Sequence, residues 1–136
     1  MAKKDELRCK SIRMDSTGIA NYDTQHIWKW SPDRDIKIWK VFMSLDVPVL
    51  MFGTQWTWLA KGAVDMIAPA PGPNEEEMIF AAMHITAETA AANNANELFN
   101  FSPKYIEVED GETVVLSTRQ PADQAVGVTL IIYYTT

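Results

Sequence analysis

Cysteine and histidine are scarce in this sequence of 136 residues. Cys9 is the single cysteine, which excludes a disulfide within the chain. The two histidines are His26 and His84, and neither Cys-x-x-Cys nor His-x-x-x-His spacing occurs. A zinc site would therefore need carboxylates to complete it. We expect one domain, residues 1–136, that builds its core without disulfide, metal or cofactor.

Long apolar runs and the common glycine motifs of enzymes are also missing. No apolar run approaches the ~20 residues that span a bilayer, and the charged start MAKKDELRCK lacks the apolar centre of a signal peptide. The sequence has no Gly-x-Gly-x-x-Gly, phosphate loop or Gly-x-Ser-x-Gly elbow. We expect a protein that is used without secretion, does not enter a membrane and is not an enzyme.

Acidic residues gather at two predicted turns. Asp33 and Asp35 flank one of them, and Glu107, Glu109 and Asp110 lie beside the other. Carboxylates could bind calcium, or act as a glycosidase pair if two of them lay about 5 to 10 Å apart across a cleft. Neither group has the spacing of a known calcium loop, so we interpret both as solvated turn residues.

Charge is distributed unevenly along the chain. The net charge is −6, which argues against nucleic acid as the main partner. Residues 1–40 carry nine basic and six acidic side chains, whereas residues 41–136 carry three basic and twelve acidic ones. The first part could therefore bind an acidic partner or the acidic part of a neighbouring copy. Alternatively, both parts are simply solvated faces of one domain.

The basic N-terminal segment, residues 1–15, is the candidate docking arm. Its basic side chains are Lys3, Lys4, Arg8, Lys10 and Arg13. If this segment is a separate arm, deleting residues 1–13 should weaken partner binding and leave the fold intact.

Period-two alternation predicts strands over residues 22–31 and 54–61. In both segments one face is the more apolar, and it carries His26, Trp28 and Trp30 in the first and Trp56, Trp58 and Ala60 in the second. His26 and His84 are interpreted as hydrogen-bonded residues of the core or its rim.

Two further segments are apolar on both faces. Residues 35–45 begin by alternating and end almost wholly apolar, and residues 125–134 carry apolar or aromatic side chains on both faces. Strands of this kind are covered on both sides. We expect the final strand to lie in the middle of a sheet.

The remaining segments separate the strands. Residues 69–77 hold three prolines and predict an exposed loop, and Asp110-Gly111 predicts a turn between alternating runs. Residues 86–96 have enough helix propensity for a turn or two of helix. Eight or nine short strands without a repeat predict an all-β fold, an antiparallel β-sandwich of the single jelly-roll type.

The spacing of the tryptophans leaves two interpretations open. Residues i and i+2 of a strand lie about 6.6 Å apart on one face, so Trp28/Trp30 and Trp56/Trp58 each form a ladder of two rings. Exposed ladders could stack on sugars, whereas buried ladders fill a core or a subunit interface. Because the ladders lie on the apolar faces, we favour the core or an interface.

The surplus of large apolar residues favours self-association. Five tryptophans, seven methionines and 47% hydrophobic residues are many for one small core. In a closed oligomer we expect the tryptophans at the subunit boundary. The candidate interface residues are Trp28, Trp30, Trp39, Trp56 and Trp58.

The C-terminal segment, Tyr105–Tyr134, resembles the end of small phage structural proteins. The resemblance rests on IEVEDGETVVLSTR and the terminal strand GVTLIIYYTT, about the last 30 residues. It implies a jelly-roll virion protein of the capsid decoration or cement type. Such proteins are trimers that bind neighbouring copies of the major capsid protein, and the family has no catalytic residues.

Together these observations lead to one main hypothesis and one alternative. The main hypothesis is a non-enzymatic, self-associating decoration protein, a trimer made in the host cytoplasm, that stabilises a phage head and becomes part of the virion. The alternative is a carbohydrate- or receptor-binding module of a phage tail, in which Trp28, Trp30, Trp56 and Trp58 stack on the ligand.

Overall fold

The computed structural model describes residues 6–16, 24–46, 55–64, 66–67, 70–71, 78–85, 94–119 and 126–136. Its strands are β1 (Arg8–Asp15), β2 (Thr24–Trp30), β3 (Ile36–Asp46), β4 (Gln55–Lys61), β5 (Met66–Ile67), β6 (Ala70–Pro71), β7 (Ile79–Ile85), β8 (Asn94–Asn100), β9 (Ile106–Val108), β10 (Val114–Arg119) and β11 (Gly127–Thr135). In this part of the chain no helix is long and apolar enough to cross a bilayer.

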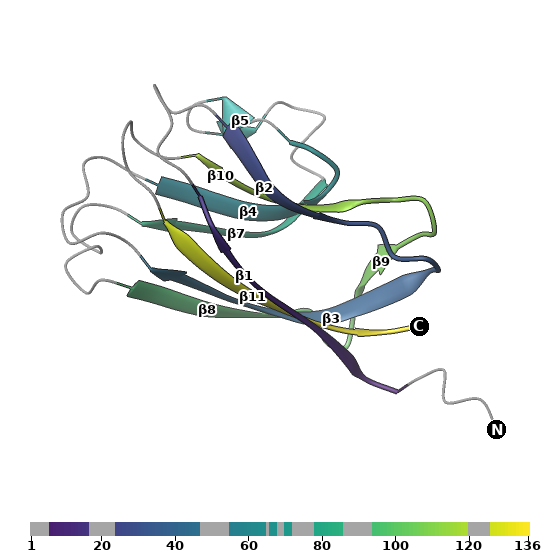
Figure 1. The fold of residues 1–136 in the computed structure, drawn as a ribbon. Helices are drawn as coiled ribbons and strands as arrows, with labels where there is room; N and C mark the ends of the chain where they lie inside the picture. Colours follow the sequence, from purple (N-terminus) through teal and green to yellow (C-terminus); the bar gives the residue numbers. More distant parts are fainter. Residues whose placement is uncertain are drawn as a thin grey trace.

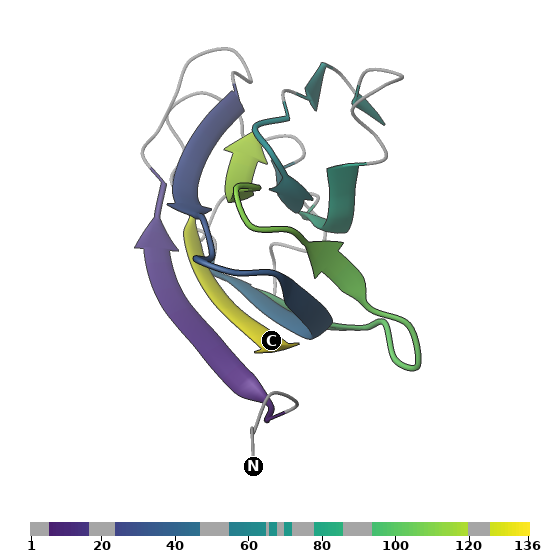
Figure 2. The same cartoon turned by 90° about the vertical axis from the view of Figure 1, so that its right-hand side faces the viewer.

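Two antiparallel sheets form the sandwich (Figure 1). The first sheet, sheet A, has the order β1-β11-β3-β8, with β9 paired to the start of β3, and the second, sheet B, has the order β2-β10-β4-β7. Figure 2 shows β1 and β11 running side by side along sheet A. β11 lies between β1 and β3, so the prediction that the final strand is central is confirmed.

The pairing pattern identifies the topology as a jelly roll. β4 pairs with β7, β3 with β8, β2 with β10 and β1 with β11, so that the pairs nest within one another along the sequence. The nested pairs form one long antiparallel hairpin. This hairpin folds over on itself, so that β11 also pairs with β3 and β10 also pairs with β4. The predicted all-β jelly-roll sandwich is therefore confirmed.

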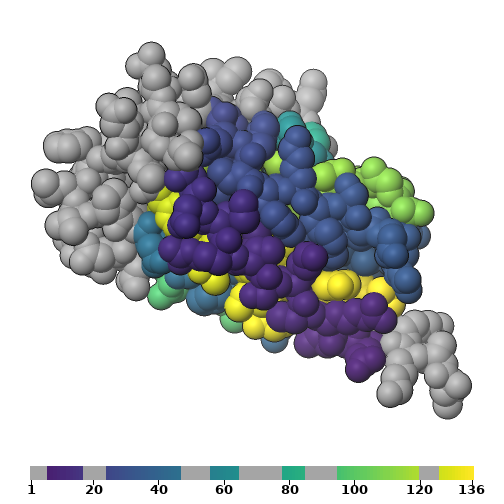
Figure 3. Space-filling model, in the orientation of Figure 1, coloured from purple at the N-terminus to yellow at the C-terminus, as the bar shows by residue number. Residues whose placement is uncertain are grey.

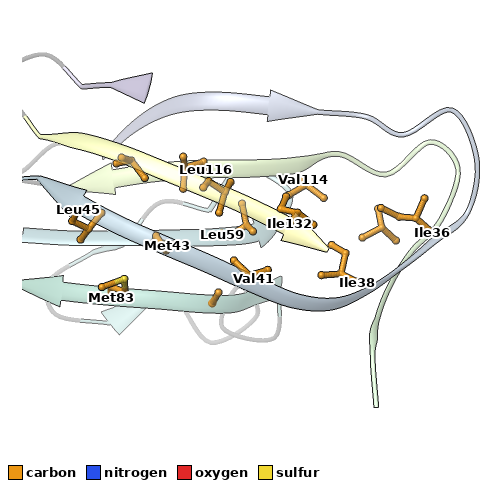
Figure 4. Packing of buried hydrophobic residues seen from close by; sticks show 14 of the residues in the cluster. Ile36, Ile38, Val41, Met43, Leu45, Leu59, Met83, Val114, Leu116 and Ile132 are labelled. Carbon is orange, nitrogen blue, oxygen red and sulfur yellow. The ribbon is translucent and has the colours of Figure 1, made fainter. Parts of the chain in front are cut away.

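The core lies between the sheets, where every second residue of a strand points inward (Figure 4). β3 supplies five side chains that are at most 2% exposed: Ile36, Ile38, Val41, Met43 and Leu45. The alternation on β3 shifts at Trp39, where the ladder passes from Lys40–Tyr133 to Ile38–Tyr134. This β-bulge keeps both halves of an eleven-residue strand facing the core. Each fully buried side chain of this size contributes about 1.5–3 kcal/mol.

The turn at Asp110-Gly111 is also confirmed. Gly111 has a φ of +98°, a conformation that favours glycine, and the backbone N–H of Glu112 donates to the carbonyl of Glu109 at 2.9 Å. The strands that flank this turn do not pair with each other, because β9 pairs with β3 in sheet A and β10 belongs to sheet B. The turn therefore carries the chain from one sheet to the other.

The structure corrects two sequence-based predictions about loops. Residues 94–96 were expected to be helical, but they begin β8 and pair with β3; long-range pairing overrides a weak helix propensity. Residues 69–77 were expected to contain no strand, but Ala70–Pro71 pair with Met66–Ile67 in a short hairpin. The other residues of 69–77, and residues 86–93, lie outside the described part of the chain.

The N-terminal segment is also different from the expected arm. From Arg8 to Asp15 it is strand β1, paired with β11 along its whole length. Residues 1–13 include most of this strand, so the structure does not support the expectation that they can be deleted without effect on the fold. Lys3 and Lys4 lie outside the described residues.

Candidate interaction surface

The two tryptophans of β2 point into the sandwich. Trp28 lies opposite Leu116 and Trp30 opposite Val114, and both rings pack against the core to which these β10 residues belong. The two rings stack with centroids 6.1 Å apart, and Tyr134 meets Trp30 edge-on at 5.2 Å. This ladder therefore closes one side of the core.

The tryptophans of β4 lie on the opposite face of sheet B. Leu59 is the β4 residue that enters the main core. Trp58 instead packs in a second cluster with Val64, on the outer face of the sheet, and Trp56 packs against this cluster. Trp58 is fully buried, so it cannot stack on a sugar or reach a subunit boundary. This agrees with the favoured interpretation of the ladders as buried residues and corrects Trp58 as an interface residue, and the platform of four exposed rings that the sugar-binding alternative needs does not form.

The two histidines lie on this outer face as well. A shift of register between Leu116 and Ser117 places His26 opposite Ser117, so His26 does not share a face with Trp28 as the alternation predicted. His84 is exposed, and its ring lies 4.8 Å from that of Trp56. The interpretation as a hydrogen-bonded residue is confirmed for His26, which bonds to Ser117, whereas His84 is exposed and contacts Trp56 through its ring.

Two carboxylates at these turns, those of Asp35 and Glu112, accept hydrogen bonds from backbone N–H groups. The N–H of Asp110 donates to Asp35 Oδ1 at 2.7 Å, and the N–H of Glu109 donates to Glu112 Oε1 at 2.8 Å. Within the described residues no group of three or more histidine, cysteine, aspartate or glutamate side chains could hold a metal ion. These acids therefore act as turn residues in the structure.

The basic residues of β1 alternate between two environments. Arg8 and Lys10 face β2, where the Lys10 ammonium lies 5.6 Å from the centroid of Trp30, a cation–π distance. Figure 3 shows β1 and β2 side by side on this surface. Arg13 faces the other way and forms ion pairs with Asp46 and Asp15. The hydrogen bond to Asp46 raises the pKa of Arg13.

A shallow hollow of about 290 Å³ opens at the end of the sandwich where β1 begins. Its walls include Arg8, Trp30, Arg34 and Tyr134. Arg34 is already paired with the adjacent Asp33 at 3.3 Å, and both side chains are more than half exposed to solvent. Ion pairs at such positions are weak.

A group of partly exposed apolar side chains lies on the outer face of sheet A. We call it the outer patch, and it consists of Trp39, Phe42, Leu98, Tyr105, Ile131 and Tyr133. Its centre is a row across three strands, in which Ile131 lies opposite Phe42 and Phe42 opposite Leu98. Leu98 is 55% exposed and Tyr105 is 41% exposed. The other four are half-buried.

Trp39 lies in the outer patch near the C-terminal end of β11. Its indole Nε1–H donates to Thr135 Oγ1 at 2.9 Å, and its ring lies 5.1 Å from that of Tyr105. The ammonium of Lys37 lies over Tyr105 at 5.1 Å. Trp39 is therefore the one candidate tryptophan on the outer face of sheet A, where a partner could contact it.

Polar rows border the centre of the patch on both sides. Toward one end lie Thr129 and Ser44, which face each other on β11 and β3; Ser44 donates to Asn96 Oδ1. Toward the other end lie Lys40 and Asn100, which also face each other. An apolar centre with a polar rim is the usual anatomy of a protein interface.

The sequence contained a signal for this surface, although it did not identify the residues. Residues 35–45 and 125–134 were expected to be covered on both sides, and sheet B covers only the face that carries residues such as Met43 and Leu130. The opposite face carries Phe42 and Ile131, which stay partly exposed. Strands with two apolar faces predict a second covering layer.

Comparisons with known proteins identify the fold. No protein-family model matches the chain, and no curated protein matches it. A chain of the cyanophage Pam1 capsid asymmetric unit is similar in structure, with a TM-score of 0.53, 14% identity, and coverage of 98% of this chain and 88% of that one. A chain from Bacillus endospore appendages, described as disulfide-linked pili, has a TM-score of 0.53 at 12% identity, with coverage of 97% and 89%.

These similarities extend over nearly the whole of all three chains. At such low identity they show a shared fold and nothing further. The expected resemblance to jelly-roll structural proteins of virions is confirmed at the level of the fold.

Proposed function

We propose that this chain is a structural protein of a virion and, more narrowly, a decoration or cement protein of a phage head. The observation that carries the proposal is the outer patch, an apolar surface on a jelly-roll sheet that stays partly exposed. The similarity to a cyanophage capsid chain supports a virion role, and the resemblance of the last strands to phage structural proteins supports the narrower one.

Cementing requires no reaction, only a difference in affinity. A protein that binds the assembled shell and not its free subunits stabilises the shell by the free energy of that binding. Self-association multiplies the effect, because one copy that is bound holds the others close to their sites. In this proposal the partner is the major capsid protein, and the chain, made in the host cytoplasm, associates with itself as well. A trimer remains the prediction from the family resemblance.

The test is co-sedimentation with shells assembled from the major capsid protein of the same genome. We expect the chain to sediment with shells and to raise the temperature at which they disassemble. Binding to the free subunits should be much weaker. Equal binding to subunits and shells would contradict cementing, and no binding to either would overturn the virion proposal.

A further inference from the structure

We infer that the outer patch pairs with the outer patch of a second copy about a two-fold axis. The inference rests on the self-association in the proposed function, and it assigns the surface and the geometry. Of the three large apolar side chains that are exposed among the described residues, Leu98 and Tyr105 belong to this patch. The third, Leu7, lies just before β1.

The charges along the face indicate how two copies would be oriented. Asp15 and Asp46 lie at one end of the outer face, where Arg13 compensates one of the two. Lys37 and Lys40 lie toward the other end, beyond the apolar row, where Glu107 lies opposite Lys37 and compensates one of the two. One end is therefore more acidic and the other more basic.

A two-fold axis that lies in the plane of the outer face of sheet A, along the row from Ile131 to Leu98, places apolar residues against apolar residues and opposite charges against each other. Each residue of this row then meets its own copy, so apolar side chains cover one another. The acidic end of one copy meets the basic end of the other, and Asp46 comes to the level of Lys37. An axis along the strands would instead bring like charges together.

A two-fold pair also needs less of the surface than a ring does. An isologous interface uses one patch twice, whereas a three-fold ring needs two different patches that fit each other. Two of the three exposed large apolar side chains among the described residues lie in the outer patch, and its centre and ends are self-complementary. A pair is therefore favoured over the trimer that the family resemblance implied.

Light-scattering mass is the first test, with the two exposed leucines as a matched pair. We expect the wild-type protein at twice the 15.3 kDa chain mass. Leu98→Lys should give a single chain mass, because it places two charges against each other on the two-fold axis. Leu7→Lys should leave the pair unchanged, although Leu7 is as exposed as Leu98 (58% and 55%). Circular dichroism of each variant verifies that it is folded.

A charge exchange tests the orientation. Lys37→Glu and Asp46→Lys should each weaken the pair about tenfold, since each change acts at both ends of a two-fold interface. The double variant should recover most of the wild-type affinity, because the ends are complementary again. A double variant that is weaker than either single one would overturn this axis.

Chemical crosslinking locates the axis. Ser11 lies opposite Ile131, level with the apolar row, and Cys9 lies two residues away on the same face of β1. Packed sheets are about 10 Å apart, which is too far for a disulfide, so a short bismaleimide is the probe. Ser11→Cys in a Cys9→Ser background should crosslink efficiently, and the native Cys9 alone should crosslink poorly. The reverse result would overturn the geometry.

The outcomes separate this inference from the virion proposal. A wild-type monomer or trimer, or a pair that survives Leu98→Lys, would overturn the pairing even if the protein still sediments with shells. A pair with the expected properties that never binds shells would leave the pairing intact and contradict the virion role.

Discussion

His26 Nδ1 lies 2.6 Å from Ser117 Oγ on the outer face of sheet B, although simple alternation places His26 beside Trp28. The bulge in the pairing of β2 with β10 turns the His26 side chain to the outer face of sheet B, while both tryptophans of β2 still pack against the core. Ser117 is fully buried. The pair therefore joins an edge strand to the centre of the sheet.

Removing this hydroxyl should weaken the fold modestly. Ser117→Ala should lower the free energy of unfolding by about 1 kcal/mol, because the buried contact with His26 is lost. Ser31→Ala is the control, since the Ser31 hydroxyl contacts Thr113 Oγ1 at 2.7 Å in an exposed position. Urea denaturation measures both. Equal effects of the two changes would show that the buried contact with His26 contributes no more to stability than the exposed contact of Ser31.

Trp58 should tolerate loss of its polar atom but not of its volume. Its Nε1 is buried and has no hydrogen-bond partner in the described structure, and a buried unpaired donor costs about 1–3 kcal/mol. Trp58→Phe should therefore be close to neutral, because the removal of the donor offsets part of the lost volume. Trp58→Ala should cost about 3–5 kcal/mol through the cavity it leaves. Thermal unfolding distinguishes these outcomes, and a Phe variant as unstable as the Ala variant would contradict the argument.

The two glycines that have positive φ among the described residues should respond differently to alanine. Gly111 has φ +98° with open space around it, so Gly111→Ala should cost about 1 kcal/mol from backbone strain alone. Gly62 has φ +123°, and a Cβ there would also overlap the Met78 methyl group. Gly62→Ala should cost more, and adding Met78→Ala should remove part of the excess. If Met78→Ala does not reduce the cost of Gly62→Ala, the steric explanation is wrong.

N-terminal deletions should show which part of the N-terminal segment contributes to the stability of the fold. Deleting residues 1–5 should leave the melting temperature unchanged, because β1 begins at Arg8. Deleting residues 1–13 should lower it strongly, since β11 would lose the strand that covers one of its edges. If the longer deletion leaves the melting temperature unchanged, β1 does not contribute to stability as the pairing implies.

Local patterns in the sequence were sufficient for the strands and the fold class. The alternation of apolar and polar residues predicted β2 and β4, and continuous apolar character predicted the central position of β11. Asp110-Gly111 predicted the turn, because only a residue without a Cβ adopts its φ readily. These features depend on a few neighbouring residues, so they can be deduced without the tertiary structure.

The tertiary structure decided which side of each strand is covered. β4 has Leu59 on one face and Trp58 on the other, and a period of two does not indicate which of them meets the core. The bulges at His26 and Trp39 reverse a face through pairing with distant strands. The outer patch arises in the same way, since Ile131, Phe42 and Leu98 become neighbours only when three strands pair in register. Sequence by itself determined that strands β3 and β11 have two apolar faces, and only the packing of sheet B against one face left the other available to a partner.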